Sequence, residues 1–109
     1  MNVIFHKLID ELSKLGLHRG YHDAGYEKYG FGDCKSTFIA IYKQTIPPNC
    51  TVYCNLHITK DGEFYTDSSR IYVIENDFDE IIAEMKKLIT EYKELKVKYK
   101  KQQIEKDFE

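Results

Sequence analysis

The last third of the chain carries a hydrophobic repeat whose steps alternate between three and four residues. This spacing places the apolar side chains on one face of a single helix. Asn76 and Asp77 precede the repeat, Glu80 follows three residues after Asp77, and neither Gly nor Pro interrupts the segment, which predicts both a helix start and an unbroken body. The repeat consists of Phe78, Ile81, Met85, Leu88, Tyr92, Leu95 and Tyr99.

This helix is expected to be longer than the body on which it packs. About 30 helical residues span about 45 Å, whereas the rest of the chain should form a body about 30 Å across by radius-of-gyration scaling. The part of the helix from about residue 93 to residue 109 should therefore protrude or find a partner.

A second amphipathic pattern opens the chain and predicts a helix over about residues 2–15. Ile4, Leu8, Leu12 and Leu15 share one helical face, and Gly16 supplies a left-handed stop. The glycine-rich segment that follows scatters tyrosines and phenylalanines through what we interpret as a flexible loop. Within it, a short strand over residues 17–22 and a hairpin are the only regular structure expected.

Three stretches of the middle region predict strands, over residues 36–43, 51–59 and 63–75, with an irregularity at residues 67–69. In the second stretch apolar and polar residues alternate, which is typical of a strand with one buried face. Pro47 and Pro48 mark one turn, and Lys60-Asp61-Gly62 marks a hairpin because an Asp-Gly pair suits positive backbone angles.

These elements predict a single domain of 109 residues, 1–109. Its fold class is α+β: a two-layer sandwich with an N-terminal helix, an antiparallel sheet of three to four strands and a long C-terminal helix. Because helices occur only at the two ends, both are expected to cover the same apolar face of the sheet.

The charge distribution is uneven. The formal net charge of −2 argues against a protein that coats nucleic acid over its whole surface. From Tyr92 to Lys106, however, six lysines face only two glutamates, which gives a local balance of +4. The lysines are Lys93, Lys96, Lys98, Lys100, Lys101 and Lys106, and the glutamates are Glu94 and Glu105.

The cysteines and histidines predict neither disulfides nor a metal site. Cys34, Cys50 and Cys54 are odd in number, and no apolar run has transmembrane length, so we expect a cytoplasmic chain without a membrane segment. His18 and His22 are four residues apart, and on a strand their side chains would lie about 13 Å apart, too far for one metal ion. No metal and no cofactor is predicted.

Two short motifs resemble parts of known functional sites. His57-Ile58-Thr59 has the His-x-Thr form used by phosphoesterases of the two-histidine type, but those enzymes need two copies and this chain has one. The segment from Lys28 to Gly32 invites comparison with the aromatic strand of RNA-recognition domains. Asp33 and Ser36 stand where further aromatic residues belong, so the sequence indicates no membership of that family.

The leading functional prediction is a small non-enzymatic binding protein. Its basic, aromatic C-terminal helix is expected to engage RNA or a nucleic-acid-handling protein complex, because lysines contact phosphates and tyrosines stack on bases. The predicted contacts are Tyr92, Lys93, Lys96, Lys98, Tyr99, Lys100 and Lys101 on the helix, with Tyr26, Tyr29 and Phe31 as contacts from an aromatic loop.

Three alternatives stay open. The first is an inhibitor that binds a protein target. It would be of the phage or mobile-element type, such as an anti-CRISPR-like protein, or of the immunity-protein type. The second is a homodimer through the heptad face of the C-terminal helix. The third is a small hydrolase or phosphoesterase-like enzyme around His57, with Thr59 and Tyr65 as the next residues to test.

Overall fold

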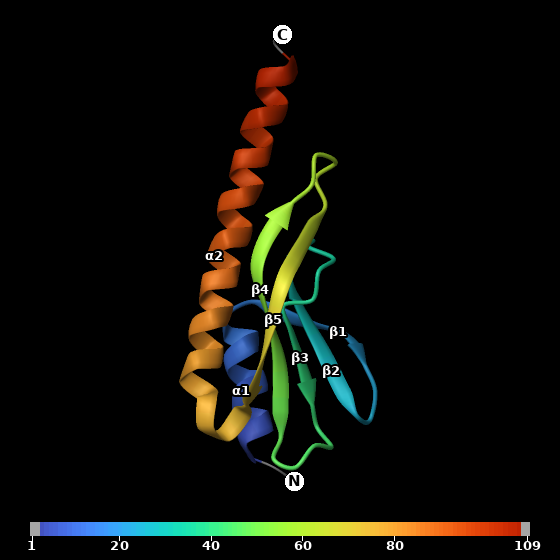
Figure 1. The fold of residues 1–109 in the computed structure, drawn as a ribbon, viewed down its shortest axis with the longest axis vertical. Coiled ribbons are helices and arrows are strands. Elements are labelled where there is room, and N and C mark those ends of the chain that lie inside the picture. The colour runs from blue at the N-terminus through green and yellow to red at the C-terminus, as the bar shows by residue number, and fades with distance from the viewer. Residues whose placement is uncertain (1–2, 108–109) are drawn as a thin grey trace.

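A computed structural model describes residues 3–107, which form an α+β domain with one helix at each end of an antiparallel sheet (Figure 1). The α+β class and both terminal helices are confirmed, although the sheet has five strands instead of three to four. Residue 2, where the first helix was expected to begin, and residues 108–109 of the expected protruding segment lie outside the described residues. The elements are α1 (Val3–Lys14), β1 (Leu17–His22), β2 (Tyr26–Phe31), β3 (Ile39–Tyr42), β4 (Asn49–Ile58), β5 (Phe64–Val73) and α2 (Ile74–Asp107).

The strand that the sequence prediction lacked is β2. The predicted strand over residues 17–22 is confirmed as β1, and the predicted hairpin is its pairing with β2. The interpretation of residues 26–31 as part of a flexible loop is wrong, since they pair with β1 on one side and with β3 on the other. Glu27 and Tyr29 are buried while Tyr26 and Lys28 are partly exposed, so the segment alternates with the period of a strand. Gly30 lies within this strand without a positive φ and therefore does not end it.

The sheet is a simple meander in the order β1-β2-β3-β4-β5. Each strand pairs with the next in an antiparallel sense, and the predicted hairpin turns at residues 47–48 and 60–62 are confirmed. Gly62 has a φ of 87° in the second of these turns, as the Asp-Gly pair requires. Asn55 has a φ of 58° within β4, on the strand that faces the expected irregularity.

Both helices cover the same face of the sheet, as predicted (Figure 1). Side chains from α1, α2 and the inner face of the strands form one apolar core. Its largest fully buried members are Phe38, Leu8, Leu12, Ile39, Ile41, Ile74, Ile81, Met85, Leu88, Val52 and Cys50. No helix of residues 3–107 covers the other face of the sheet, which we call the open face.

Helix α2 follows β5 directly and begins at Ile74, before the predicted start. Asp77 has non-helical angles (φ −115°, ψ 20°), and its carboxylate accepts a hydrogen bond of 3.0 Å from the Val73 amide. It therefore marks a kink in the first turns. The heptad face of α2 is buried in the domain's own core as far as Tyr92.

Contact between α2 and the rest of the domain continues to Tyr99. A Cβ atom added at Gly62 would lie 3.0 Å from the Tyr99 ring, so the β4–β5 hairpin and the helix meet closely at this glycine. Beyond it the helix rises past the strands (Figure 1), and the domain measures 58 × 25 × 23 Å. Within residues 3–107, no helix combines the length and the apolar composition needed to cross a bilayer.

Candidate nucleic-acid interface

The predicted contacts on α2 fall into an inward group and an outward group. Tyr92 belongs to the inward group, since its side chain is 4% exposed. Its ring lies 4.9 Å from that of Phe64 and 5.6 Å from that of Phe31, between centroids. A ring in this position packs the core and has no free face for a base.

Lys96 forms an ion pair with Asp33, a contact that the sequence did not predict. Its ammonium donates to the Asp33 carboxylate at 3.2 Å and to the Tyr92 hydroxyl at 3.2 Å, and the same hydroxyl donates to Asp33. The Tyr92 hydrogen bond and then the Lys96 ammonium hold the pKa of the Asp33 carboxyl below its usual value. These contacts tie the β2–β3 loop to α2 and neutralise one of the predicted phosphate-binding charges.

The outward group keeps its charges free for a ligand. Lys93, Lys98, Lys100 and Lys101 are exposed, and none of them forms an ion pair with another described residue. Lys93 also lies over the Phe31 ring, 5.7 Å from its centroid. We call these four residues the distal lysines. They give the C-terminal half of α2 an excess of positive charge over Glu94 and Glu105.

A groove of about 470 Å³ lies between α2, the β4–β5 hairpin and the β2–β3 loop. Tyr99 lines it from α2, so of the two predicted helix tyrosines this is the one with a ring edge toward an open space. Lys100, from α2, and Lys35, from the β2–β3 loop, also line this groove. Sequence reasoning missed Lys35, because only the fold brings the β2–β3 loop next to a helix about sixty residues later.

The three rings predicted as an aromatic loop do not form one surface. They lie on strand β2, where Tyr29 is 4% exposed and points into the core. Phe31 also faces α2, against Tyr92. Tyr26 alone points to the open face, where its ring stacks on that of Tyr42 at 5.8 Å between centroids.

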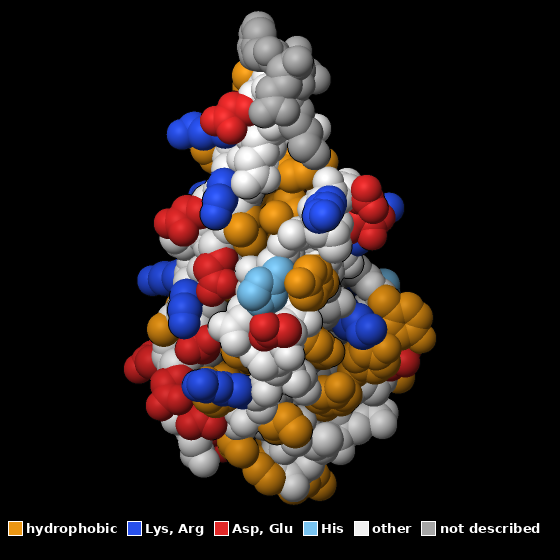
Figure 2. Space-filling model, turned by 45° about the horizontal axis from the view of Figure 1, so that its top comes forward, with side chains coloured by type: hydrophobic (Ala, Val, Ile, Leu, Met, Phe, Trp, Pro, Cys, Tyr) orange, Lys and Arg blue, Asp and Glu red, His pale blue; other side chains and the backbone are white. Residues whose placement is uncertain are grey.

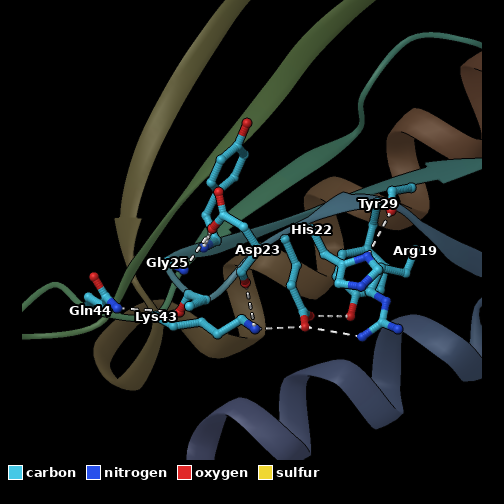
Figure 3. A network of polar contacts seen from close by, with 11 residues as sticks. Arg19, His22, Asp23, Gly25, Tyr29, Lys43 and Gln44 are labelled. Atoms are coloured by element: carbon cyan, nitrogen blue, oxygen red, sulfur yellow. Dashed lines mark hydrogen bonds and ion pairs between the residues drawn. The ribbon is translucent and has the colours of Figure 1, made fainter.

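A network around Glu27 fastens β1, β2 and β3 to one another (Figure 3). The buried Glu27 carboxylate lies 2.9 Å from the Lys43 ammonium and 3.3 Å from the Arg19 guanidinium, and it accepts a 2.7 Å hydrogen bond from the Tyr29 hydroxyl. Burial raises the pKa of Glu27, but the Lys43 and Tyr29 hydrogen bonds and the two positive charges outweigh it and leave the pKa below its usual 4.5. The network thus positions the strands and leaves Glu27 ionised at neutral pH.

Replacing Glu27 with Gln is expected to lower the free energy of unfolding at pH 7 by about 1 to 3 kcal/mol, because charge-assisted hydrogen bonds in a buried site are lost. A carboxyl whose pKa is depressed on folding stabilises the fold above its unfolded value, here 4.5, and loses that contribution as the pH falls through the folded value. Urea melts at several pH values should therefore show a smaller acid-induced loss in the Gln variant. Parallel profiles for both proteins would contradict this role of Glu27.

His57 lies on the open face, away from the basic helix. Its Nε2 is 2.7 Å from an Asp67 carboxylate oxygen, and its ring stacks on Tyr65 with centroids 5.2 Å apart. The Thr59 hydroxyl, which a phosphoesterase would turn toward phosphate, accepts a 3.1 Å hydrogen bond from the Glu63 amide inside the hairpin turn. His57, Tyr65 and Asp67 form a surface cluster.

The three cysteines are free thiols, and Cys34 and Cys50 are buried. Burial raises the pKa of the Cys50 thiol to about 12 and also raises that of Cys34. Such thiols are protonated at neutral pH and poor nucleophiles. Among the residues that the structure describes, no three His, Cys, Asp or Glu side chains gather as metal ligands would.

The polar chemistry of the described residues therefore concentrates in two places, the free lysines of α2 with the adjoining groove, and the tyrosine-bearing open face. No protein-family model, curated protein or solved structure matches this chain, so its function has to be inferred from these residues and their geometry.

Proposed function

We propose that this protein is a non-enzymatic binding protein that engages RNA, or a complex that carries RNA, through the distal lysines of α2. The observation that supports this most directly is the set of four exposed lysines without an ion-pair partner among the described residues. They lie on the C-terminal half of α2, which runs from beside the core at Tyr92 to the end of the helix past the strands (Figure 1). A polyanion can reach them there without a change in the fold.

Electrostatics favours this ligand class over a neutral one. Lysines crowded on one helix segment repel one another, and an anion that approaches them relieves this repulsion. Nucleic acid adds an entropic gain, because each phosphate that a lysine contacts releases condensed counterions. The contacts are with phosphates, so the helix is expected to bind without reading a base sequence.

The salt dependence of binding tests this proposal. A fluorescently labelled single-stranded RNA should bind the purified protein at low salt, and log K should fall with log salt with a slope near three, for about four phosphate contacts of about 0.7 each. Fluorescence anisotropy between roughly 50 and 200 mM salt measures this slope. If no RNA associates at the lowest salt, the proposal fails.

A protein target is the second candidate, and one observation favours it. Val97 and Ile104 are 55% and 56% exposed on the same helix segment as the distal lysines. An inhibitor that used this stripe would lose its target on Val97→Ser with Ile104→Ser, and salt would have little effect on its affinity. The RNA proposal expects these two changes to have little effect on RNA binding.

A further inference from the structure

The open face of the sheet is unusually rich in tyrosine. The alternation of side chains along the strands, with their paired neighbours, turns Tyr26, Tyr42, Tyr53 and Tyr65 to this face. Tyr21 lies at the irregularity of β1 and joins them through contact of its ring with that of Tyr26. Hydrophobic side chains, a class that includes tyrosine, gather over the sheet in the lower right of Figure 2, whereas charged side chains crowd the helix on its left. A sheet face without a covering helix is normally polar, so this number of aromatic rings is unusual. The rings beside the lysines of β2 and the β2–β3 loop are the candidates for contact with a ligand.

Three of the rings form a row across the strands at the β1 side of the sheet. Tyr21 lies 5.5 Å from Tyr26, and Tyr26 lies 5.8 Å from Tyr42, between ring centroids. The Tyr21 side chain, at the end of the row, is 61% exposed. Tyr26 and Tyr42 are partly exposed. Accessible rings at this spacing are the kind of platform on which nucleobases stack.

A hollow of about 240 Å³ lies beside this row. Gly20 and Gly30 form part of its lining, and a Cβ atom at Gly30 would lie 3.4 Å from the Ser36 carbonyl oxygen and 3.8 Å from the His18 ring. Glycines inside strands mark places where a ligand can approach the backbone closely. Tyr21 also lines the hollow, so its exposed ring lies beside backbone that the glycines leave accessible.

The charge around the hollow is positive. Lys28 and Lys35 both line it, and the Lys28 ammonium is 5.8 Å from the centroid of the Tyr26 ring. The Asp23 carboxylate, at the nearby β1–β2 turn, accepts hydrogen bonds from the Gly25 and Tyr26 amides at 2.7 and 2.9 Å. This acid is therefore engaged in the turn.

Lys35 joins the open face to α2. It lines this hollow and also the groove that contains Lys100, one of the distal lysines. Asp33 and Glu63 also line the groove, and Asp33 is paired there with Lys96. Lys35 and Lys100 therefore link the end of α2, around the β2–β3 loop, to the tyrosine row, with Glu63 as the one groove acid among the described residues that has no ion pair. An extended polyanion can follow this path, since successive phosphates meet successive ammonium groups.

We propose that the hollow and the tyrosine row bind single-stranded nucleic acid. Bases stack on Tyr21 and Tyr26, the phosphates contact Lys28 and Lys35, and the strand continues onto the distal lysines. This inference rests on the proposed function and extends it, because it identifies a base-binding site and a requirement for unpaired bases. In a duplex the bases are stacked within the helix and cannot reach such a platform.

The test compares variants of the open face in anisotropy titrations with a labelled single-stranded RNA of about twelve nucleotides, enough for one binding track. Tyr21→Leu should weaken binding roughly 5- to 150-fold, because one stacked base loses its ring. Lys28→Gln should lower the salt slope by about 0.7. Tyr65→Leu is the matched control, since Tyr65 is also exposed on this face but lies on β5, and it should leave affinity within about twofold.

A second variant fills the hollow without removing a ring. Gly30→Ala has no positive φ to oppose it, and its methyl group would make only ordinary van der Waals contact, so the fold should persist while affinity falls. Urea melts establish that each variant is folded before its affinity is compared. Unchanged affinity in folded Tyr21→Leu, Lys28→Gln and Gly30→Ala proteins would overturn the base-binding site.

The same titrations separate this inference from the proposed function. With Lys28 and Lys35 added to the distal lysines, about six phosphate contacts raise the expected salt slope to about four. If the slope stays near three and the open-face variants bind as well as the wild type, the lysine-based proposal stands and the base-binding site fails. If duplex RNA competes as well as the single strand, the base-binding site also fails. Single-stranded DNA of the same sequence identifies the ligand: comparable affinity supports single strands in general, and a clear preference for RNA supports recognition of the 2′-hydroxyl. No binding to any nucleic acid overturns both.

Discussion

Replacing Lys93, Lys98, Lys100 and Lys101 together with Glu is expected to weaken binding of single-stranded RNA by about two to four orders of magnitude at low salt. Each change removes one phosphate contact and adds a like charge, so both counterion release and direct attraction are lost. Lys96 stays in place in this variant, because its ion pair with Asp33 helps to hold the β2–β3 loop against α2. Anisotropy titrations at fixed salt measure the loss.

A variant with the same change in net charge elsewhere on the helices provides the control. Lys7, Lys14, Lys86 and Lys87 are exposed, and they lie on α1 and on the first half of α2. Reversing these four charges alters the overall charge equally but leaves the distal cluster intact. If the two quadruple variants lose the same affinity, net charge governs binding and the distal lysines are not an interface.

The elements that sequence reasoning identified correctly are those whose pattern is local. The heptad of α2 repeats over about six turns, and the Asp61-Gly62 turn carries its own backbone preference, so neither depends on distant residues. Both helices could be placed on one side of the sheet because a meander of hairpins offers a single apolar face.

Strand β2 was not predicted because it is identified mainly by its pairing with β1 and β3, which the sequence does not show. Glycines were interpreted as breaks in regular structure, although Gly20 lies in the edge strand β1, which pairs with β2, and Gly30 lies in β2, which pairs with β1 and β3. The alternation of Tyr26, Lys28 and Gly30 on one face with Glu27 and Tyr29 on the other is the signal that a strand interpretation could have used.

The candidate interface was predictable only in part for a related reason. The excess of lysine after Tyr92 is visible in the sequence, but which lysines are free is decided by contacts across the fold. Asp33 binds Tyr92 and Lys96 from about sixty residues away, and Lys35 reaches the groove of Lys100 from the same loop. Periodicity carries no information about such pairs, since they depend on how the β2–β3 loop docks on α2.

Leu88→Ala is expected to lower the free energy of unfolding by about 2 to 5 kcal/mol. Leu88 is 2% exposed within the core that α2 shares with the sheet, so truncation loses buried apolar surface and leaves a cavity. Urea melts with equal m-values measure the change.

Lys100→Ala is the matched change on the same helix, in the segment past the sheet. Lys100 is exposed and has no ion pair with another described residue, so its loss should alter stability by less than about 0.5 kcal/mol. Tyr99→Ala should fall between the two, because the Tyr99 ring is partly buried against Gly62. This order, with Leu88 first and Lys100 last, follows from burial that decreases along α2. Equal destabilisation by Leu88→Ala and Lys100→Ala would mean that the packed and free parts of the helix have been assigned wrongly. The distal lysines would then not be an accessible surface.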